Sequence, residues 1–134
     1  MRIMVDTNTL ISASVFGGRV AEAFALIIER KHKIVISDYA IDELRRVANR
    51  KFPHRIDVIE RFLDGFDFEL ACTPPSLDVL GSISVRDPKD NPILASALIA
   101  DVDVLITGDH DFYSLDIERP AIMTIGDFIK EFCT

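Results

Sequence analysis

Short apolar runs alternate with longer amphipathic segments along this chain of 134 residues. The runs at 3–5, 34–36 and 102–107 are rich in β-branched residues and nearly continuous, which is typical of parallel strands buried on both faces. Weaker runs at 66–70 and 121–125 predict two further short strands. The alternation of strands and helices predicts a single α/β domain, a three-layer α/β/α sandwich around a central sheet.

Apolar residues recur at helical spacing between the expected strands. We expect a short helix at 10–14 and longer helices at about 20–30, 40–48, 56–63, 93–100 and 127–132. The start of the helix at 93–100 has two alternatives. Either Asp87 caps it with Pro88 in the first position, or Asn91 caps it with Pro92 there.

Composition favours a packed globular protein, since 49% of the residues are hydrophobic. None of the apolar runs approaches the roughly 18 residues that a membrane-spanning helix needs. The two cysteines, Cys72 and Cys133, lie far apart in the sequence. These features together predict a reduced, cytoplasmic protein with no membrane association.

The net charge of −7 argues against a nucleic-acid partner, because such proteins usually carry a basic surface. The basic residues are unevenly spread, however, and many fall in the middle of the chain. They could form a solvated helical face or a surface for phosphates, and both alternatives stay open. This basic segment contains Arg45, Arg46, Arg50, Lys51, His54, Arg55 and Arg61.

Carboxylates follow the expected strands at or near their carboxyl ends. Asp6 comes directly after the first strand, and Glu43 lies in the helix that follows the second. Asp90 opens the late helix, whereas Asp109 and Asp111 follow the strand at 102–107. The carboxyl ends of parallel strands lie at one rim of the sheet, so these acids are expected to meet there. A hard divalent cation would neutralise their mutual repulsion.

Each acid also has a simpler structural role. Asp6 suits the N-cap of the next helix, and Glu43 could pair with Arg46 within its own helix. Asp87 and Asp90 both suit a helix N-terminus, so either could be the third acid of the site. We favour Asp90, because it precedes Leu94 by four residues and Ala97 by seven and therefore faces the buried side. The case for a site depends on the joint placement of these acids.

Other residues near the expected rim could contact a substrate. Asn8 follows Asp6 by two residues and could hydrogen-bond to a phosphate or to a metal-bound water. Basic side chains could hold the phosphate backbone of a nucleic acid. The expected substrate-binding residues are Asn8, Thr107, Arg45, Arg46 and Lys89.

Four segments together resemble the PIN-domain nucleases, and the resemblance covers essentially the whole chain. They are Val5-Asp6-Thr7-Asn8, Ile36-Ser37 followed by Glu43-Leu44, Asp90 ahead of Ala95-Ser96-Ala97, and the run from Ile106 to Phe112. The pattern is similar to that of the VapC-type toxins of prokaryotic toxin–antitoxin pairs.

The resemblance implies a mainly parallel sheet of about five strands and a ribonuclease activity that depends on Mg²⁺ or Mn²⁺. It also implies a homodimer and a cognate antitoxin whose tail blocks the site. The catalytic and metal-binding residues that it implies are Asp6, Glu43, Asp90 and Asp109, with Asp111 as a further metal ligand.

Rival function classes fit the sequence less well. A haloacid-dehalogenase-type phosphatase needs a second aspartate two residues after Asp6, where Asn8 stands. A response-regulator receiver needs a late lysine near the site, but Lys130 falls in the terminal helix. A dinucleotide-binding domain needs a Gly-rich turn after the first strand. A PIN-fold module that binds RNA or an antitoxin without cleavage stays open as the alternative.

Overall fold

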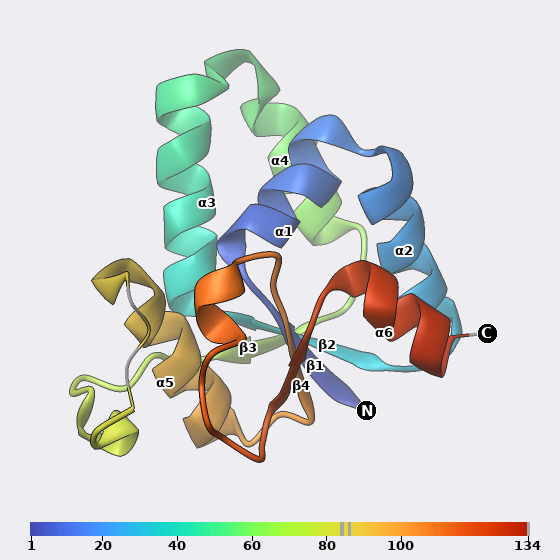
Figure 1. The fold of residues 1–134 in the computed structure, drawn as a ribbon. Coiled ribbons are helices and arrows are strands. Elements are labelled where there is room, and N and C mark those ends of the chain that lie inside the picture. Colours follow the sequence, from blue (N-terminus) through green and yellow to red (C-terminus); the bar gives the residue numbers. More distant parts are fainter. Residues whose placement is uncertain (84, 86, 134) are drawn as a thin grey trace.

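The computed structural model describes residues 1–83, 85 and 87–133 and contains a five-stranded sheet (Figure 1). All neighbouring strands pair in parallel, in the order β3-β2-β1-β4-β5. This confirms the expected sheet. The strands are β1 (Arg2–Val5), β2 (Lys33–Ser37), β3 (Glu69–Ala71), β4 (Val104–Ile106) and β5 (Ala121–Met123). The helices are α1 (Thr7–Ile11), α2 (Gly18–Glu29), α3 (Asp38–Lys51), α4 (Ile56–Asp64), α5 (Asn91–Ala100) and α6 (Ile125–Phe132).

Side-chain alternation along the strands creates a core on each face of the sheet. In β2, Ile34 and Ile36 face one core, whereas Val35 faces the other. Helices α1, α2, α3, α4 and α6 contribute to the first core, and α5 contributes to the second. Figure 1 shows the resulting layers, with the larger group of helices above the sheet and α5 below it. The predicted three-layer sandwich is confirmed, with outer layers of unequal size.

The order of the strands reverses between β1 and β4. From β1 the chain builds outward through β2 to β3, then returns to place β4 on the other side of β1. The backbone N–H of Asp6 donates to the carbonyl of Ile106 over 3.1 Å, so the ends of these two strands are held together. Ligands of open α/β sheets bind in the crevice outside the carboxyl ends at such a reversal.

Several expected boundaries differ from those of the structure. The strand expected at 66–70 begins at Glu69, because Phe66 and Phe68 belong to a cluster of aromatic rings. The ring centroid of Phe66 lies 6.0 Å from that of Phe24 and 5.2 Å from that of Phe62. The periodicity of two along this segment therefore reflects aromatic packing and not strand pairing.

The start of α5 agrees with the first alternative drawn from the sequence for the turn before the helix, whereas the second is wrong, because the N-cap residue of α5 is Asp90 and not Asn91. The Asp87 carboxylate accepts a hydrogen bond from the Lys89 N–H and caps a 3₁₀ turn, Pro88–Asp90. Helix α5 follows directly from Asn91, whose side-chain carbonyl accepts a hydrogen bond from the Val85 N–H over 2.8 Å. This turn brings Asp90 to the front of α5.

Among the described residues, no single helix has both the length and the apolar character needed to cross a membrane. The segments Thr7–Phe16 and Gly18–Glu29 meet those criteria only when taken together, and the chain bends by 108° between them.

Candidate active site

Asp6 and Thr107 form a buried hydrogen-bonded pair at the ends of the two central strands. The Asp6 side chain caps α1 by accepting the Thr9 N–H over 2.9 Å, which is the structural role expected for it. Its other oxygen accepts the Thr107 hydroxyl over 2.6 Å. Burial raises the pKa of the Asp6 carboxyl, and the hydrogen bonds from Thr107 and Thr9 offset part of that rise.

The loop after β4 is folded onto this pair. The Thr107 hydroxyl, which is completely buried, accepts the Asp109 N–H over 3.0 Å. The Asp109 carboxylate in turn accepts the Asp111 N–H over 2.9 Å and caps a 3₁₀ turn, His110–Phe112. Thr107 therefore positions Asp6 and Asp109 relative to each other, and its burial leaves no surface for direct contact with a substrate.

Asp90, at the start of α5, lies next to Asp109, which belongs to the loop after β4. Burial is the largest cause that raises the pKa of Asp90, to about 7, and a hydrogen bond with the Asp109 side chain is the second. The negative charges of Asp109, Asp87 and Asp6 act in the same direction. Three carboxyl groups from the ends of β1 and β4 and the start of α5 are thus brought together at the strand-order reversal.

A cavity of about 260 Å³ opens in front of these groups, and we call it the acidic cavity. Asp90 and Asp109 line it, and Glu43 reaches it from α3. Asp6 lies behind its wall, where its two neighbours Thr7 and Asn8 form part of the surface. All four members of the expected acidic quartet therefore lie at or directly behind one cavity.

Asp87 also lines the acidic cavity, but its side chain is engaged in capping the Pro88–Asp90 turn. The side chain of Asp90 hydrogen-bonds to that of Asp109, and the negative charges of Asp109 and Asp6 act on it. Asp111 does not line this cavity, although its backbone N–H holds the Asp109 carboxylate in position.

The donor atoms fit a hard divalent cation such as Mg²⁺ or Mn²⁺. No group of three Asp, Glu, His or Cys side chains among the described residues forms a ready-made metal cage. Mg²⁺ needs no such cage, since it keeps several waters and binds through one or two carboxylates. The crowded carboxyl oxygens of Asp90 and Asp109 supply such donors. The buried hydroxyl of Thr7, in the same wall, has no hydrogen-bond partner in the described part of the chain.

Cations line the acidic cavity, but only some of the basic residues expected to bind substrate are among them. Lys89 lines it as expected, together with Arg50 and Lys51. Arg46 lines an adjoining cavity, with its guanidinium 6.0 Å from the centre of the Tyr39 ring. Arg45 lies outside both cavities.

The guanidinium of Arg45 instead pairs with Glu60 of α4 at 2.8 Å. The sequence does contain a signal that separates Arg45 from Arg46, namely their helical spacing from Glu43. Arg46, Val47 and Arg50 follow it by three, four and seven residues and share its face, whereas Arg45 follows it by two.

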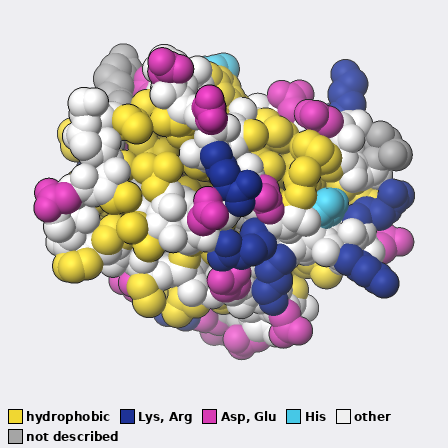
Figure 2. Space-filling view, turned by 90° about the horizontal axis from the view of Figure 1, so that it is seen from below, with side chains coloured by type: hydrophobic (Ala, Val, Ile, Leu, Met, Phe, Trp, Pro, Cys, Tyr) yellow, Lys and Arg dark blue, Asp and Glu magenta, His cyan; other side chains and the backbone are white. Residues whose placement is uncertain are grey.

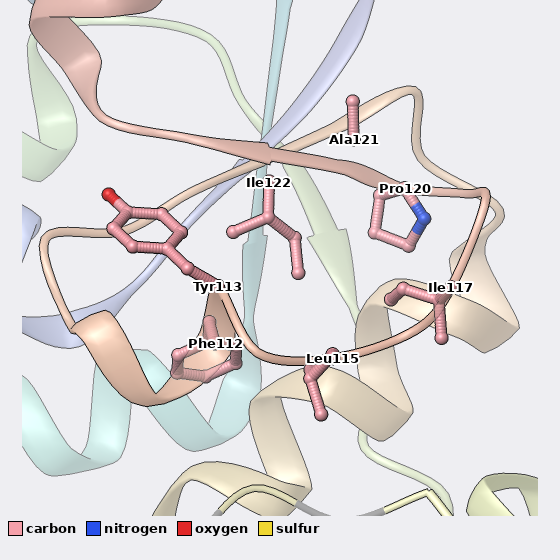
Figure 3. Close-up of a pocket in the computed structure, with 7 residues that line it drawn as sticks. All are labelled: Phe112, Tyr113, Leu115, Ile117, Pro120, Ala121 and Ile122. Atoms are coloured by element: carbon pink, nitrogen blue, oxygen red, sulfur yellow. The ribbon is translucent and has the colours of Figure 1, made fainter.

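A second cavity, of about 250 Å³, lies beside β5 (Figure 3). Figure 3 shows that Ile122 from β5 faces Phe112 and Leu115 from the loop before it. Among the described residues that line it, Tyr113 is the only one with a titratable side chain, and its hydroxyl donates to the Thr107 carbonyl over 2.9 Å. These lining residues do not supply the groups that hydrolysis requires, so the acidic cavity is the better candidate.

Comparisons with known structures support the fold described above. A chain of the VapBC2 complex from Rickettsia felis, determined with a DNA fragment from their promoter, superimposes with a TM-score of 0.68. The match has 16% identity and covers 92% of this chain and 97% of that one. VapC20 of Mycobacterium tuberculosis, a toxin that cleaves the sarcin–ricin loop, matches with a TM-score of 0.61 and 16% identity. That match covers 84% of this chain and 93% of the toxin.

At these identities the likeness to determined structures establishes the fold. No curated protein matches the sequence significantly. The family model described as "PIN domain" matches residues 2–111, which include all four acids of the quartet. The chain therefore belongs to the PIN-domain family.

Proposed function

We propose that this chain is a metal-dependent endoribonuclease and the toxin of a toxin–antitoxin pair. The observation that carries the proposal is the crowding of Asp6, Asp90 and Asp109 at the strand-order reversal. Within the described residues, none of the three has a Lys or Arg partner within 4.0 Å. Acids left unpaired in this way destabilise a fold unless a cation neutralises them.

Asp90 and Asp109, with Asp6 behind them and Glu43 facing them, would hold Mg²⁺ or Mn²⁺. A bound divalent ion would supply activation of water and neutralisation of charge on the phosphate. Asp111 would assist by fixing the orientation of the Asp109 carboxylate through its N–H. Thr107 keeps Asp6 and Asp109 in register, so that the oxygens are set before substrate arrives.

Substrate contacts would come from the polar rim of the acidic cavity. The Asn8 amide can donate to a phosphate oxygen. Arg50, Lys51 and Lys89 supply positive charge that attracts the RNA backbone despite the net charge of the chain. Because the charges at this rim are of both signs, the cationic side chains would hold phosphates that flank the bond to be cleaved.

The biological setting is proposed by analogy with the similar structures. One belongs to a VapBC complex and another is an RNA-cleaving toxin. We propose a cognate antitoxin that covers the acidic cavity, a homodimeric assembly and a cytoplasmic site of action on RNA.

The test is cleavage of labelled RNA by wild type, Asp90→Asn and Asp103→Asn in the presence of Mn²⁺. Asp103 is the matched control, because it lies at the amino end of β4 and pairs with Arg119 at 3.0 Å. Wild type and Asp103→Asn should cleave, and Asp90→Asn and chelated wild type should not. RNA binding by wild type without cleavage under any metal would instead support the non-catalytic alternative.

A further inference from the structure

Two cavities flank the acidic cavity and share wall residues with it. The basic cavity, of about 260 Å³, contains Tyr39 and Arg46 and shares Glu43, Val47, Arg50 and Lys89 with the acidic cavity. The neutral cavity, of about 160 Å³, lies on the other side and shares Asn8. Each of the two cavities therefore adjoins the acidic cavity through shared wall residues near the carboxyl end of the sheet.

The basic cavity has the composition of a phosphate site. Arg46, Arg50 and Lys89 contribute three positive charges against the single negative charge of Glu43. The ring of Tyr39 supports the Arg46 guanidinium from 6.0 Å away, which limits the conformations of that long side chain. A supported guanidinium can bind a phosphate through two parallel N–H bonds at a smaller entropic cost.

None of the described residues that line the neutral cavity carries a charged side chain. Asn8, Thr9, Ser12 and Thr124 supply amide and hydroxyl groups, and Val20 and Ile125 supply apolar surface. A nucleoside needs this combination, since its base has apolar faces and its edges and ribose need hydrogen bonds. Gly108 opens the wall further, because a Cβ placed there would meet no atom within 4 Å.

We propose that the three cavities form one track for a single RNA strand with a fixed polarity of contacts. The phosphate on one side of the cleaved bond lies in the basic cavity, held by Arg46, Arg50 and Lys89. The nucleoside on the other side lies in the neutral cavity. The inference rests on the proposed function, because the acidic cavity must hold the bond that is cleaved.

The first test measures binding without cleavage, in an Asp90→Asn background. The probe is a short fluorescent single-stranded RNA of random sequence, and the readout is the slope of log affinity against log salt. Removal of one phosphate contact by Arg46→Gln should reduce the slope by about 0.7. Arg61→Gln removes the same charge from α4, where the guanidinium contacts the Asp57 carbonyl, and should leave the slope unchanged. Equal slopes for Arg46→Gln and Arg61→Gln would overturn the track.

The second test locates the contacts on the RNA. Oligonucleotides that carry one uncharged methylphosphonate at successive positions are cleaved by wild type and by Arg46→Gln. For wild type we expect the cleavage rate to fall roughly tenfold when the methylphosphonate replaces one phosphate on one side of the cleaved bond, as for one charge-assisted contact of about 1.4 kcal/mol. For Arg46→Gln the same replacement should cause no further fall in the cleavage rate. Equal losses on both sides would contradict the polarity. Failure of wild type to cleave any strand would refute the nuclease proposal, while the binding slopes would still decide the track.

Discussion

At the amino end of the strands the acids form ion pairs with arginines, whereas at the carboxyl end the acids lie next to one another. Arg2 pairs with Glu69 at 2.8 Å, and Arg119 pairs with Asp101 at 2.9 Å and with Asp103 at 3.0 Å. Figure 2 shows the molecule from the amino end, where acidic and basic side chains gather in the middle between apolar areas.

The pKa values of the carboxyl groups are therefore shifted in opposite directions at the two ends of the sheet. A hydrogen bond from the Arg2 guanidinium lowers the pKa of Glu69, and one from the Arg2 N–H lowers that of Asp103. At the other end, burial raises the pKa of both Asp6 and Asp90. Paired acids stabilise the fold a little, and the crowded acids destabilise it. A departure of this kind from local consistency is expected where a ligand completes the site.

The largest contrast should come from Asp6→Asn, which removes one charge from the crowded end. We expect RNA cleavage with Mn²⁺ to fall by at least about 100-fold, as for loss of a metal-ordering group. The melting temperature without metal should not fall. The Asn carbonyl can still accept the Thr9 N–H, and the relief of repulsion offsets the altered bond to Thr107. If the variant were markedly less stable but still cleaved RNA, Asp6 would act only as the N-cap of α1.

Added Mn²⁺ should stabilise the folded state through the crowded end alone. At a hundredfold excess over Kd, binding to the native state adds about 2.7 kcal/mol to the free energy of unfolding. Thermal melts with and without Mn²⁺ measure the effect in wild type, Asp90→Asn and Asp103→Asn. The Asp103→Asn protein should respond as wild type does, and the response of Asp90→Asn should be much smaller. Equal responses in all three would place the ion elsewhere.

The crowding of acids at the carboxyl end could be predicted from the sequence, because it follows from chain direction. Continuous apolar runs identified the central strands, and parallel strands must end at one rim, so Asp6 and Asp109 were expected to be neighbours. The helical spacing from Leu94 and Ala97 similarly indicated that Asp90 turns inward. The catalytic roles of these acids stay predictions until cleavage is measured.

What the sequence could not provide was the packing between elements. Helical spacing from Glu43 distinguishes the faces of Arg45 and Arg46, but only the docking of α4 on α3 provides Arg45 with Glu60 as its partner. The later start of β3 also involves a contact between distant segments, since Phe66 packs against Phe24 of α2 in addition to its neighbours Phe62 and Phe68. Contacts between segments distant in the sequence thus contribute to both outcomes.

The pH dependence of stability should separate the two ends further. The pKa of Asp90 rises from 3.8 to about 7 on folding, so the native state holds more protons than the unfolded state between these values. The free energy of unfolding without metal should therefore fall as pH rises from about 4 to about 7. Melting temperatures of Asp90→Asn across that range should lack this part of the slope. Identical slopes in the two proteins would mean that Asp90 ionises normally.

The smallest effect is expected at the amino end, from Arg2→Gln. The side chains of Arg2 and Glu69 are 36% and 43% exposed, and a pair of that kind contributes about 0.2–1 kcal/mol. The melting temperature should drop slightly, and by less in high salt, because salt screens the pair. RNA cleavage should equal that of wild type, whereas Arg46→Gln should weaken cleavage with little change in stability. If Arg2→Gln also impaired cleavage, the two ends of the sheet could not be separate in function.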